Sequence, residues 1–248
     1  MSLPLQDKTI LITGAAHRIG AQITRLLHQQ GANIVIHYRN SADDALALQS
    51  ELQASRPQSV HLVQADLLDI NTIDKLISQT LQQFGNLDVV INNASSFYPT
   101  AIGEVGIEQW EDLIGTNMKA PFFLSQAAAP HLQERQGCII NIVDIHADRP
   151  LKAYPVYSMA KAGLVMMTKA LANELGPEVR VNAIAPGAIL WPEQTLDEAT
   201  QEKIISRTFL KRQGDPQDIA KTALFLIATA TYMTGQVLAV DGGRSLNS

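Results

Sequence analysis

Several features are scarce in this chain of 248 residues, and each scarcity excludes a class of protein. The only cysteine, Cys138, lies in the apolar stretch 138–143, which indicates a small core residue and not a nucleophile. No signal peptide and no apolar run of membrane-spanning length is evident, so we expect a cytoplasmic protein without a membrane partner. Basic residues form no cluster and the formal net charge is −5, which argues against nucleic acid.

Metal-site spacing is also missing, and no metal is expected. No pattern typical of metal ligands connects the histidines we compared, His17, His28, His61, His131 and His146. No internal repeat, low-complexity segment or polar linker interrupts the chain, so we expect a single domain over residues 1–248.

What the chain does contain is a regular alternation of strand and helix patterns. The patterns predict strands over 8–13, 33–38, 60–64, 87–92, 138–143, 179–184 and 236–240. They predict helices over 21–30, 42–55, 70–84, 108–131, 154–175, 199–209 and 216–228. This order indicates the α/β class: a single Rossmann-type doubly wound domain with a seven-stranded parallel sheet.

A glycine-bounded turn, residues 14–20, joins the first strand to the first helix. Gly14 and Gly20 let the backbone turn sharply and approach a phosphate, and the start of the helix offers free N–H groups. The segment therefore predicts a dinucleotide site. Alternatively, Gly14 only ends a strand and Gly20 only packs a helix.

The end of the second strand lacks the acidic side chain that holds a ribose 2′-hydroxyl in NAD sites. The run 37–41 instead offers His37, Tyr38, Arg39 and Ser41, which suit a 2′-phosphate, so NADP(H) is the expected cofactor. The alternative is an exposed basic loop before a helix capped by Ser41. Asp66, after the third strand, either accepts from the adenine amino group or caps a helix.

Tyr157 and Lys161 lie one helical turn apart, with Asp144 upstream. Positions i and i+4 share a helix face, so the Lys161 cation is expected beside the Tyr157 phenol, where it favours the ionised form. The three residues predict a device that delivers protons. Taken alone, the Tyr-Lys pair also fits a partly buried tyrosine followed by a solvated lysine.

Together these motifs resemble the short-chain dehydrogenase/reductase family over essentially the whole chain. The resemblance rests on Thr13-Gly14 with Gly20, Asn92-Asn93-Ala94, Asn117, Tyr157 with Lys161, and Pro186-Gly187. It implies that Lys161 binds the nicotinamide ribose and that Asn117 holds a main-chain bend or a water that feeds protons to Lys161. It also implies an oligomer, which we expect to be a homotetramer.

Three departures from the usual family pattern resemble one branch, the pteridine reductases. Arg18 replaces a glycine, Asp144 replaces a serine, and Ser95 follows Asn-Asn-Ala. The segments 37–41, 92–100 and 143–144 are similar to that branch. The resemblance implies a small-molecule pterin or folate substrate.

The chemistry of these positions agrees with a flat, nitrogen-rich ligand. Phe97 follows the fourth strand and is expected to stack on the ring; otherwise it only anchors a loop. Asp144 beside Tyr157 would protonate a ring nitrogen, so the reduced bond is C=N, unless Asp144 only caps the following segment. Arg18 would donate to the diphosphate and to the ring, unless it is a surface arginine.

A substrate loop is expected at about 187–210, with Leu190 and Trp191 at the pocket; Trp191 either shields the ligand or packs at a subunit contact. The catalytic residues expected are Asp144, Tyr157, Lys161 and Asn117. The cofactor-binding residues expected are Gly14, His17, Arg18, Ile19, Gly20, His37, Tyr38, Arg39, Ser41, Asp66, Leu67, Asn93, Ala94, Ser95, Tyr157, Lys161, Pro186 and Gly187. Those expected at the substrate are Arg18, Ser95, Phe97, Asp144, Tyr157, Gly187, Leu190 and Trp191.

The expected function is NADPH-dependent reduction of pterins, from dihydropterin to tetrahydropterin, with dihydrofolate and oxidised pterins as further substrates. A carbonyl reductase of the 3-oxoacyl type is the first alternative, and Asp144 in place of serine counts against it. A non-catalytic NADP(H)-binding regulator is the second, and the complete set of Asn117, Tyr157 and Lys161 counts against it.

Overall fold

The structure is a computed structural model that describes residues 3–191 and 197–247. A seven-stranded parallel sheet forms its centre, in the order β3-β2-β1-β4-β5-β6-β7. The predicted Rossmann-type doubly wound fold is thereby confirmed. The strands are β1 (Thr9–Ile12), β2 (Asn33–Tyr38), β3 (Val60–Gln64), β4 (Val89–Asn92), β5 (Cys138–Ile142), β6 (Arg180–Pro186) and β7 (Val237–Val240).

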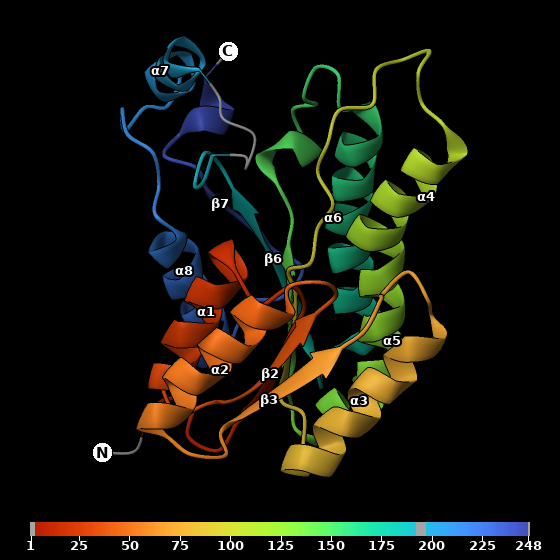
Figure 1. The fold of residues 1–248 in the computed structure, drawn as a ribbon, viewed down its shortest axis with the longest axis vertical. Helices are drawn as coiled ribbons and strands as arrows, with labels where there is room; N and C mark the ends of the chain where they lie inside the picture. Colours follow the sequence, from red (N-terminus) through yellow and green to blue (C-terminus); the bar gives the residue numbers. More distant parts are fainter. Residues whose placement is uncertain (1–2, 192–196, 248) are drawn as a thin grey trace.

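Helices cover both faces of this sheet (Figure 1). One face is covered by α1 (Arg18–Gln29), α2 (Ala42–Ser55) and α8 (Pro216–Ala228). The other is covered by α3 (Asn71–Phe84), α5 (Ala120–Glu134) and α6 (Pro155–Leu175). The remaining elements are α4 (Ile107–Ile114), the π-helical turn η1 (Gly115–Lys119), the 3-10 turns η2 (Ile145–Ala147) and η3 (Arg244–Leu246), and α7 (Glu198–Ser206).

Alternate residues of each strand point to opposite faces, and this period divides the apolar side chains between two cores. In β1, Ile10 and Ile12 pack with the α1, α2 and α8 layer, whereas Leu11 packs with the α3, α5 and α6 layer. All four residues of β1 are buried. Strands buried on both faces read as continuous apolar runs, which is why the sequence shows them so clearly.

The strand order reverses between β1 and β4, which are neighbours in the sheet although two strands separate them in sequence. In open α/β sheets, ligands bind in the crevice that such a reversal creates at the carboxyl ends of the strands. The turn after β1 and the loops after β4, β5 and β6 all meet there.

Several predicted boundaries need correction. The helix expected over 108–131 is three segments, α4, η1 and α5, because a π-helical turn interrupts it. Pro186 does not break the sixth strand but belongs to it, paired with Val240 of β7. Its missing N–H costs nothing in the ladder with β5, since that pairing ends at Ile184. Ser41 occupies the N-cap position of α2, but its side chain makes no capping hydrogen bond.

Within residues 3–191 and 197–247, no helix is long and apolar enough to cross a membrane. The same residues contain no group of histidine, cysteine, aspartate or glutamate side chains placed to hold a metal ion.

Candidate active site

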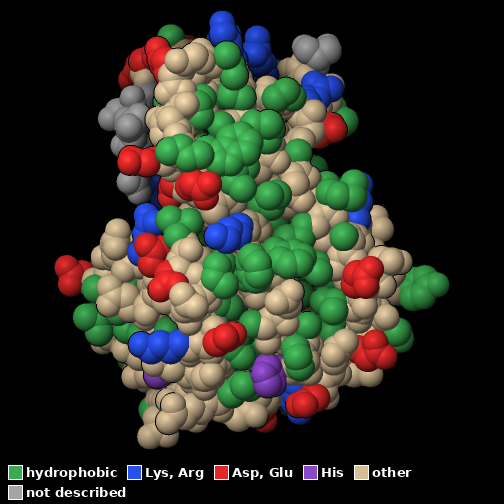
Figure 2. Space-filling model, turned by 90° about the vertical axis from the view of Figure 1, so that its right-hand side faces the viewer, with side chains coloured by type: hydrophobic (Ala, Val, Ile, Leu, Met, Phe, Trp, Pro, Cys, Tyr) green, Lys and Arg blue, Asp and Glu red, His purple; other side chains and the backbone are tan. Residues whose placement is uncertain are grey.

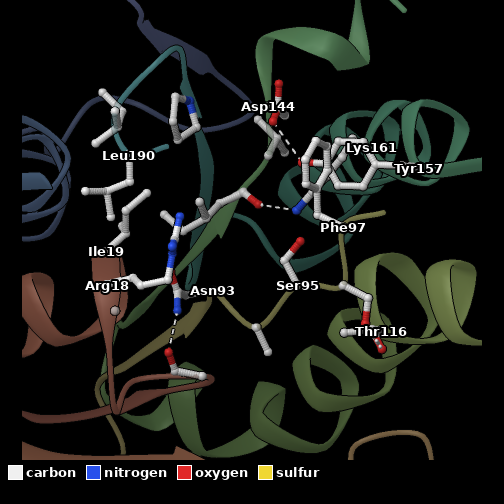
Figure 3. Close-up of a pocket in the computed structure, with 18 of the residues that line it drawn as sticks. Arg18, Ile19, Asn93, Ser95, Phe97, Thr116, Asp144, Tyr157, Lys161 and Leu190 are labelled. Carbon is white, nitrogen blue, oxygen red and sulfur yellow. Dashed lines mark hydrogen bonds between the residues drawn. The ribbon is translucent and has the colours of Figure 1, made fainter. Parts of the chain in front are cut away.

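A cavity of about 730 Å³ opens at the carboxyl ends of the strands. Every residue that the sequence placed at the cofactor or the substrate lines this cavity. Asn117, the remaining predicted catalytic residue, lies behind the wall and contacts Ser95. Figure 3 shows Arg18, Ile19 and Leu190 on one side of the cavity, with Phe97, Tyr157 and Lys161 on the other. Of the substrate loop expected over 187–210, residues 192–196 lie outside the described residues.

The glycine turn is held by contacts that leave no room for side chains. Gly14 has φ +59°, and a Cβ there would lie 2.9 Å from the Cα of Ala94. A Cβ on Gly20 would lie against the Gly14 carbonyl oxygen and 2.7 Å from Nδ2 of Asn93. Asn93 Nδ2 donates to the carbonyl oxygens of Thr13 and Gly14, at 2.8 and 2.9 Å. The turn after β1 is therefore fixed by β4, its neighbour in the sheet.

The side chain of His37 also holds this turn, through hydrogen bonds of its two ring nitrogens. Its Nδ1 accepts the Gly14 N–H at 3.2 Å, and its Nε2 lies 3.1 Å from the Ala65 carbonyl oxygen, to which it must donate. Burial lowers the pKa of His37 to about 4, so the ring is neutral at pH 7. Both ring nitrogens are engaged, which changes the role expected for His37: it shapes the turn, and it has no ring N–H left for the 2′-phosphate contact expected from the sequence.

The backbone conformation of Arg18 is one that favours glycine, the residue that the usual family pattern has at this position. Arg18 is the first residue of α1 and has φ +54°, in the left-handed region that favours glycine. A non-glycine residue there costs about 1 kcal/mol. Its guanidinium donates from Nη2 to the carbonyl oxygen of Trp191 at 2.9 Å, across the cavity mouth. The side chain thus links the nucleotide turn to the segment after β6.

The proton-delivery group is assembled from β5 and α6 (Figure 3). The hydroxyl of Tyr157 donates to Oδ2 of Asp144 at 2.8 Å, and Oδ1 of Asp144 accepts the His146 N–H at 2.8 Å. Nζ of Lys161 donates to the Ile142 carbonyl oxygen at 2.9 Å and lies 5.7 Å from the centre of the Tyr157 ring. Asp144 therefore both caps η2 and contacts the phenol, so the two roles that the sequence left open coexist.

The surroundings of Tyr157 shift its pKa in the direction opposite to the one expected from Lys161 alone. Burial first, and then the Asp144 carboxylate, raise the pKa of Tyr157 well above its usual value. Burial lowers the pKa of Lys161 to about 8, while Asp144 opposes that shift. The expectation that Lys161 would favour an ionised Tyr157 is corrected: in this geometry the phenol keeps its proton and can donate it.

Asn117 sits in the π-helical turn η1, fully buried. Its Nδ2 donates to the carbonyl oxygens of Leu113 and Ser96, at 2.9 and 3.0 Å, and its Oδ1 accepts from the Ser95 hydroxyl at 2.6 Å. A single amide thus joins the widened helical turn to the loop after β4 and orients Ser95 at the cavity wall.

An aromatic cluster forms the wall beside the phenol. The Phe97 ring stacks on Tyr154, with centres 4.7 Å apart and planes at 15°, and meets Tyr157 edge-on at 4.8 Å. Phe97 remains 42% exposed, so it presents ring surface to the cavity as well as packing against α6. Sequence reasoning missed Tyr154, although its i, i+3 spacing from Tyr157 would have placed both on one helix face.

Other lining residues were missed because nothing local marks them. Arg244 comes from η3 near the C-terminus, Thr200 and Ile204 from α7, and His146 from η2. Asp66 also lines the cavity, and its Oδ1 accepts the Leu68 N–H at 3.0 Å. This bond shapes the turn after β3 and caps no helix, because the N-cap residue of α3 is Ile70; the alternative that Asp66 caps a helix is wrong. Asp66 remains exposed at the cavity.

Comparisons with known proteins agree with the fold. Residues 14–245 match the family model described as Enoyl-(Acyl carrier protein) reductase. A probable galactose dehydrogenase from Rhizobium meliloti (strain 1021) is 34% identical over 245 residues, covering 96% of this chain and 95% of that protein. Pteridine reductase 1 from Leishmania tarentolae is 33% identical over 276 residues, covering 95% and 96%.

A 3-oxoacyl-[acyl-carrier-protein] reductase from Staphylococcus aureus (strain N315) is 34% identical over 240 residues, covering 95% of this chain and 97% of that protein. These relatives carry three different activities at nearly equal identity, so they define the family and not the substrate. The chain belongs to the short-chain dehydrogenase/reductase family of NAD(P)(H)-dependent oxidoreductases.

Proposed function

We propose that this protein reduces the C=N bond of pterins with NADPH. The observation that carries the proposal is the 2.8 Å hydrogen bond from the Tyr157 hydroxyl to Asp144, beside the exposed ring of Phe97. A carboxyl group paired with a phenol can deliver a proton to a ring nitrogen, which a carbonyl substrate does not require.

The described residues fit a dinucleotide. Gly14 and Gly20 let the turn close tightly against its protein neighbours, where a Cβ would collide with them, and both line the cavity at the start of α1, whose free N–H groups suit a diphosphate. Lys161 and Tyr157 line the same cavity farther along, where they would hold the nicotinamide ribose. When bound, the cofactor supplies a hydride to the ring carbon of the substrate.

NADP(H) is preferred to NAD(H) because of the charges after β2. Arg39 and Ser41 line the cavity, and residues 37–41 include no carboxylate that would repel a 2′-phosphate. An arginine can hold phosphate through charge-assisted hydrogen bonds.

Protonation of the substrate follows from the polar contacts of α6. The raised pKa of Tyr157 keeps its proton available at neutral pH, and Asp144 accepts that hydrogen bond until a ring nitrogen replaces it. Asp144 and Tyr157 together supply the one proton that balances the hydride, so the C=N bond becomes CH–NH. Lys161, whose pKa is about 8, lies close enough to Tyr157 to help restore that proton from solvent.

Phe97 and Arg18 would position the ring. Phe97 offers an aromatic face that a flat heterocycle can stack on, with Tyr154 stacked on Phe97 as support. Arg18, opposite Phe97 in Figure 3, would donate to the ring and to the cofactor diphosphate. Its left-handed backbone supports this role, because a residue without a binding task would be replaced by glycine at lower cost.

The test is NADPH oxidation by the purified protein with dihydrobiopterin, dihydromonapterin, dihydrofolate and an acetoacetyl thioester, together with galactose oxidation using NAD⁺ or NADP⁺. Asp144→Ser is the informative variant, because a serine can still cap the His146 N–H and preserve η2. We expect pterin turnover in the wild type and a loss on the order of 100-fold in Asp144→Ser, because Tyr157 then loses the carboxylate that accepts its hydrogen bond and orients its proton.

Other outcomes would reject the proposal in different ways. Thioester turnover that survives Asp144→Ser would assign the protein as a carbonyl reductase of the 3-oxoacyl type. Galactose oxidation without pterin reduction would assign it as a sugar dehydrogenase. Cofactor binding without turnover of any substrate would support the alternative of a non-catalytic NADP(H)-binding regulator.

The proposed assembly is a homotetramer. Figure 2 shows hydrophobic side chains gathered across the middle of the face on which α4 and α5 lie in Figure 1. The exposed large apolar residues of α4, α5 and α6 are Ile107, Trp110, Phe122, Met159 and Met166. Exposed apolar groups of this kind support a subunit contact. Light scattering of the wild type and of Met166→Glu tests the proposal, and an unchanged monomeric mass in both would reject it.

A further inference from the structure

Arg244 lies at the substrate end of the cavity and belongs to no role described so far. It comes from η3, close to the C-terminus, and lines the same cavity as Asp144 and His146. The charges that act on its guanidinium come from Asp144, Arg207 and Asp241. A C-terminal arginine is thus brought within electrostatic reach of the proton-delivery group.

The backbone of Arg244 is held rigidly. Asp241 accepts the Gly243 and Ser245 N–H groups at 2.9 and 2.6 Å, and Leu210 N donates to the Gly242 carbonyl oxygen at 3.1 Å. Gly242 and Gly243 both have positive φ, and a Cβ on Gly243 would lie 2.8 Å from the Phe209 ring. This packing fixes where η3 begins, so the backbone position from which the Arg244 side chain reaches the cavity is set before any ligand arrives.

The guanidinium of Arg244 takes no part in the contacts that hold this backbone. Among residues 3–191 and 197–247, its nitrogens make no hydrogen bond or ion pair with a protein group. The nearby Asp241 carboxylate is already occupied by two backbone donors, and the Asp144 carboxylate by Tyr157 and the His146 N–H. A half-buried guanidinium with five N–H donors therefore lines the cavity with no carboxylate of the described residues hydrogen-bonded to it.

The chemistry of the proposed substrate places its side chain near this group. In a dihydropterin, the carbon of the reducible C=N bond also carries the side chain. Asp144 and Tyr157 protonate the nitrogen of that bond, so the side chain leaves the ring next to Asp144. Arg244 is close enough to Asp144 for that carboxylate to act on its charge, whereas Arg39 follows β2 at the cofactor end.

We propose that Arg244 selects pterins whose side chain carries an anion, either a phosphate ester or a carboxylate. Its guanidinium would bind the anion through charge-assisted hydrogen bonds, which are stronger than the bonds it could make to the hydroxyl groups of a neutral side chain. The inference rests on the proposed function, since it concerns the side chain of that substrate.

The test compares kcat/KM for a phosphorylated dihydroneopterin, for dihydrofolate and for dihydrobiopterin, whose side chain is neutral. The variants are Arg244→Gln and Arg244→Lys, with Arg207→Gln as a matched control, because Arg207 is exposed and outside the cavity lining. In Arg244→Gln we expect the preference for an anionic over the neutral substrate to fall by about tenfold, the value of a charge-assisted hydrogen bond. Arg244→Lys should restore part of it, and Arg207→Gln should keep it.

The outcomes separate the inference from the function on which it rests. A fall for the phosphate ester alone identifies a phosphorylated side chain as the ligand, and a fall for dihydrofolate alone identifies a carboxylate. Equal losses with all substrates, or an unchanged preference, would overturn the role of Arg244 while leaving pterin reduction intact. If the wild type reduces no pterin, the proposed function fails and this inference fails with it.

Discussion

The two ends of the cavity are built in different ways. At the cofactor end, residues 14–20 and 37–41 follow adjacent strands, and buried backbone contacts through His37 and Asn93 hold them. At the substrate end, Phe97, Asp144, Tyr157 and Arg244 come from separate segments that meet only in the folded chain. The cofactor end is a backbone turn that side chains from neighbouring strands hold in place, whereas the substrate end depends on side chains that themselves face the cavity.

The largest effect that would sharpen this comparison is expected from Tyr157→Phe. Loss of the donated proton should lower kcat by about 1000-fold, within the range for general acid catalysis. The Kd for NADPH should change far less, since Lys161 and the turn after β1 keep their expected cofactor contacts. Steady-state kinetics and fluorescence titration measure the two quantities. Tyr232→Phe, on a fully exposed tyrosine, serves as the control. If cofactor affinity and kcat fell together, the two ends would not be separable.

The converse change at the cofactor end is Gly20→Ala. The added Cβ would meet the backbone of Ala15 at 2.9 Å as well as the Gly14 carbonyl, so the turn must shift. We expect the Kd for NADPH to rise by about 100-fold, since the phosphate N–H contacts depend on this backbone. Gly106→Ala is the matched control, because only Gln109 Oε1 lies near, at 4.0 Å. Equal affinities in both variants would contradict a turn fixed by backbone contact.

Arg18 belongs to both ends, and Arg18→Gly should separate its two effects. Glycine adopts φ +54° without strain, so the free energy of unfolding should rise by up to about 1 kcal/mol. KM for the pterin should rise by about tenfold through loss of the guanidinium. Urea denaturation measures the free energy of unfolding, and steady-state kinetics measure KM. Lower stability with an unchanged KM would show that Arg18 is only a structural link to Trp191.

The smallest effect concerns pH and His37. Its pKa in the folded protein is about 4, below the usual 6.5, so between these values the unfolded chain binds more protons than the folded one. Stability should therefore fall as pH drops from about 6.5 toward about 4. His28, with a similar pKa, contributes in the same window. His37→Gln should flatten the slope without removing it; an unaltered slope in urea denaturation at pH 7 and pH 5 would contradict the assignment.

The same contrast explains what the sequence could predict. The limits of β2, β3 and α2 were predicted to the residue, because buried parallel strands and a helix between them leave continuous local patterns. The glycines that permit the turn after β1 are visible in the sequence, although Asn93 and His37 hold its conformation. Arg244 and α7 reach the cavity only through tertiary packing, and no local pattern marks them. The direction of the Tyr157 pKa was predicted wrongly because burial and Asp144, and not helix spacing, decide it.

The π-helical turn η1 lies between α4 and α5 and sets how the side chains of α5 are rotated about the helix axis relative to those of α4. One extra residue in a helical turn rotates everything after it by about 100°, since an α-helix has 3.6 residues per turn. The apolar stripe of α5, with Leu124, Ala128 and Leu132 buried against the sheet, is therefore in register only because the turn around Asn117 is widened. A deletion that restored a regular helix would turn this stripe away from the sheet. The widened turn that places Asn117 to orient Ser95 therefore also sets how α5 packs on the sheet. A change to either one would alter the other.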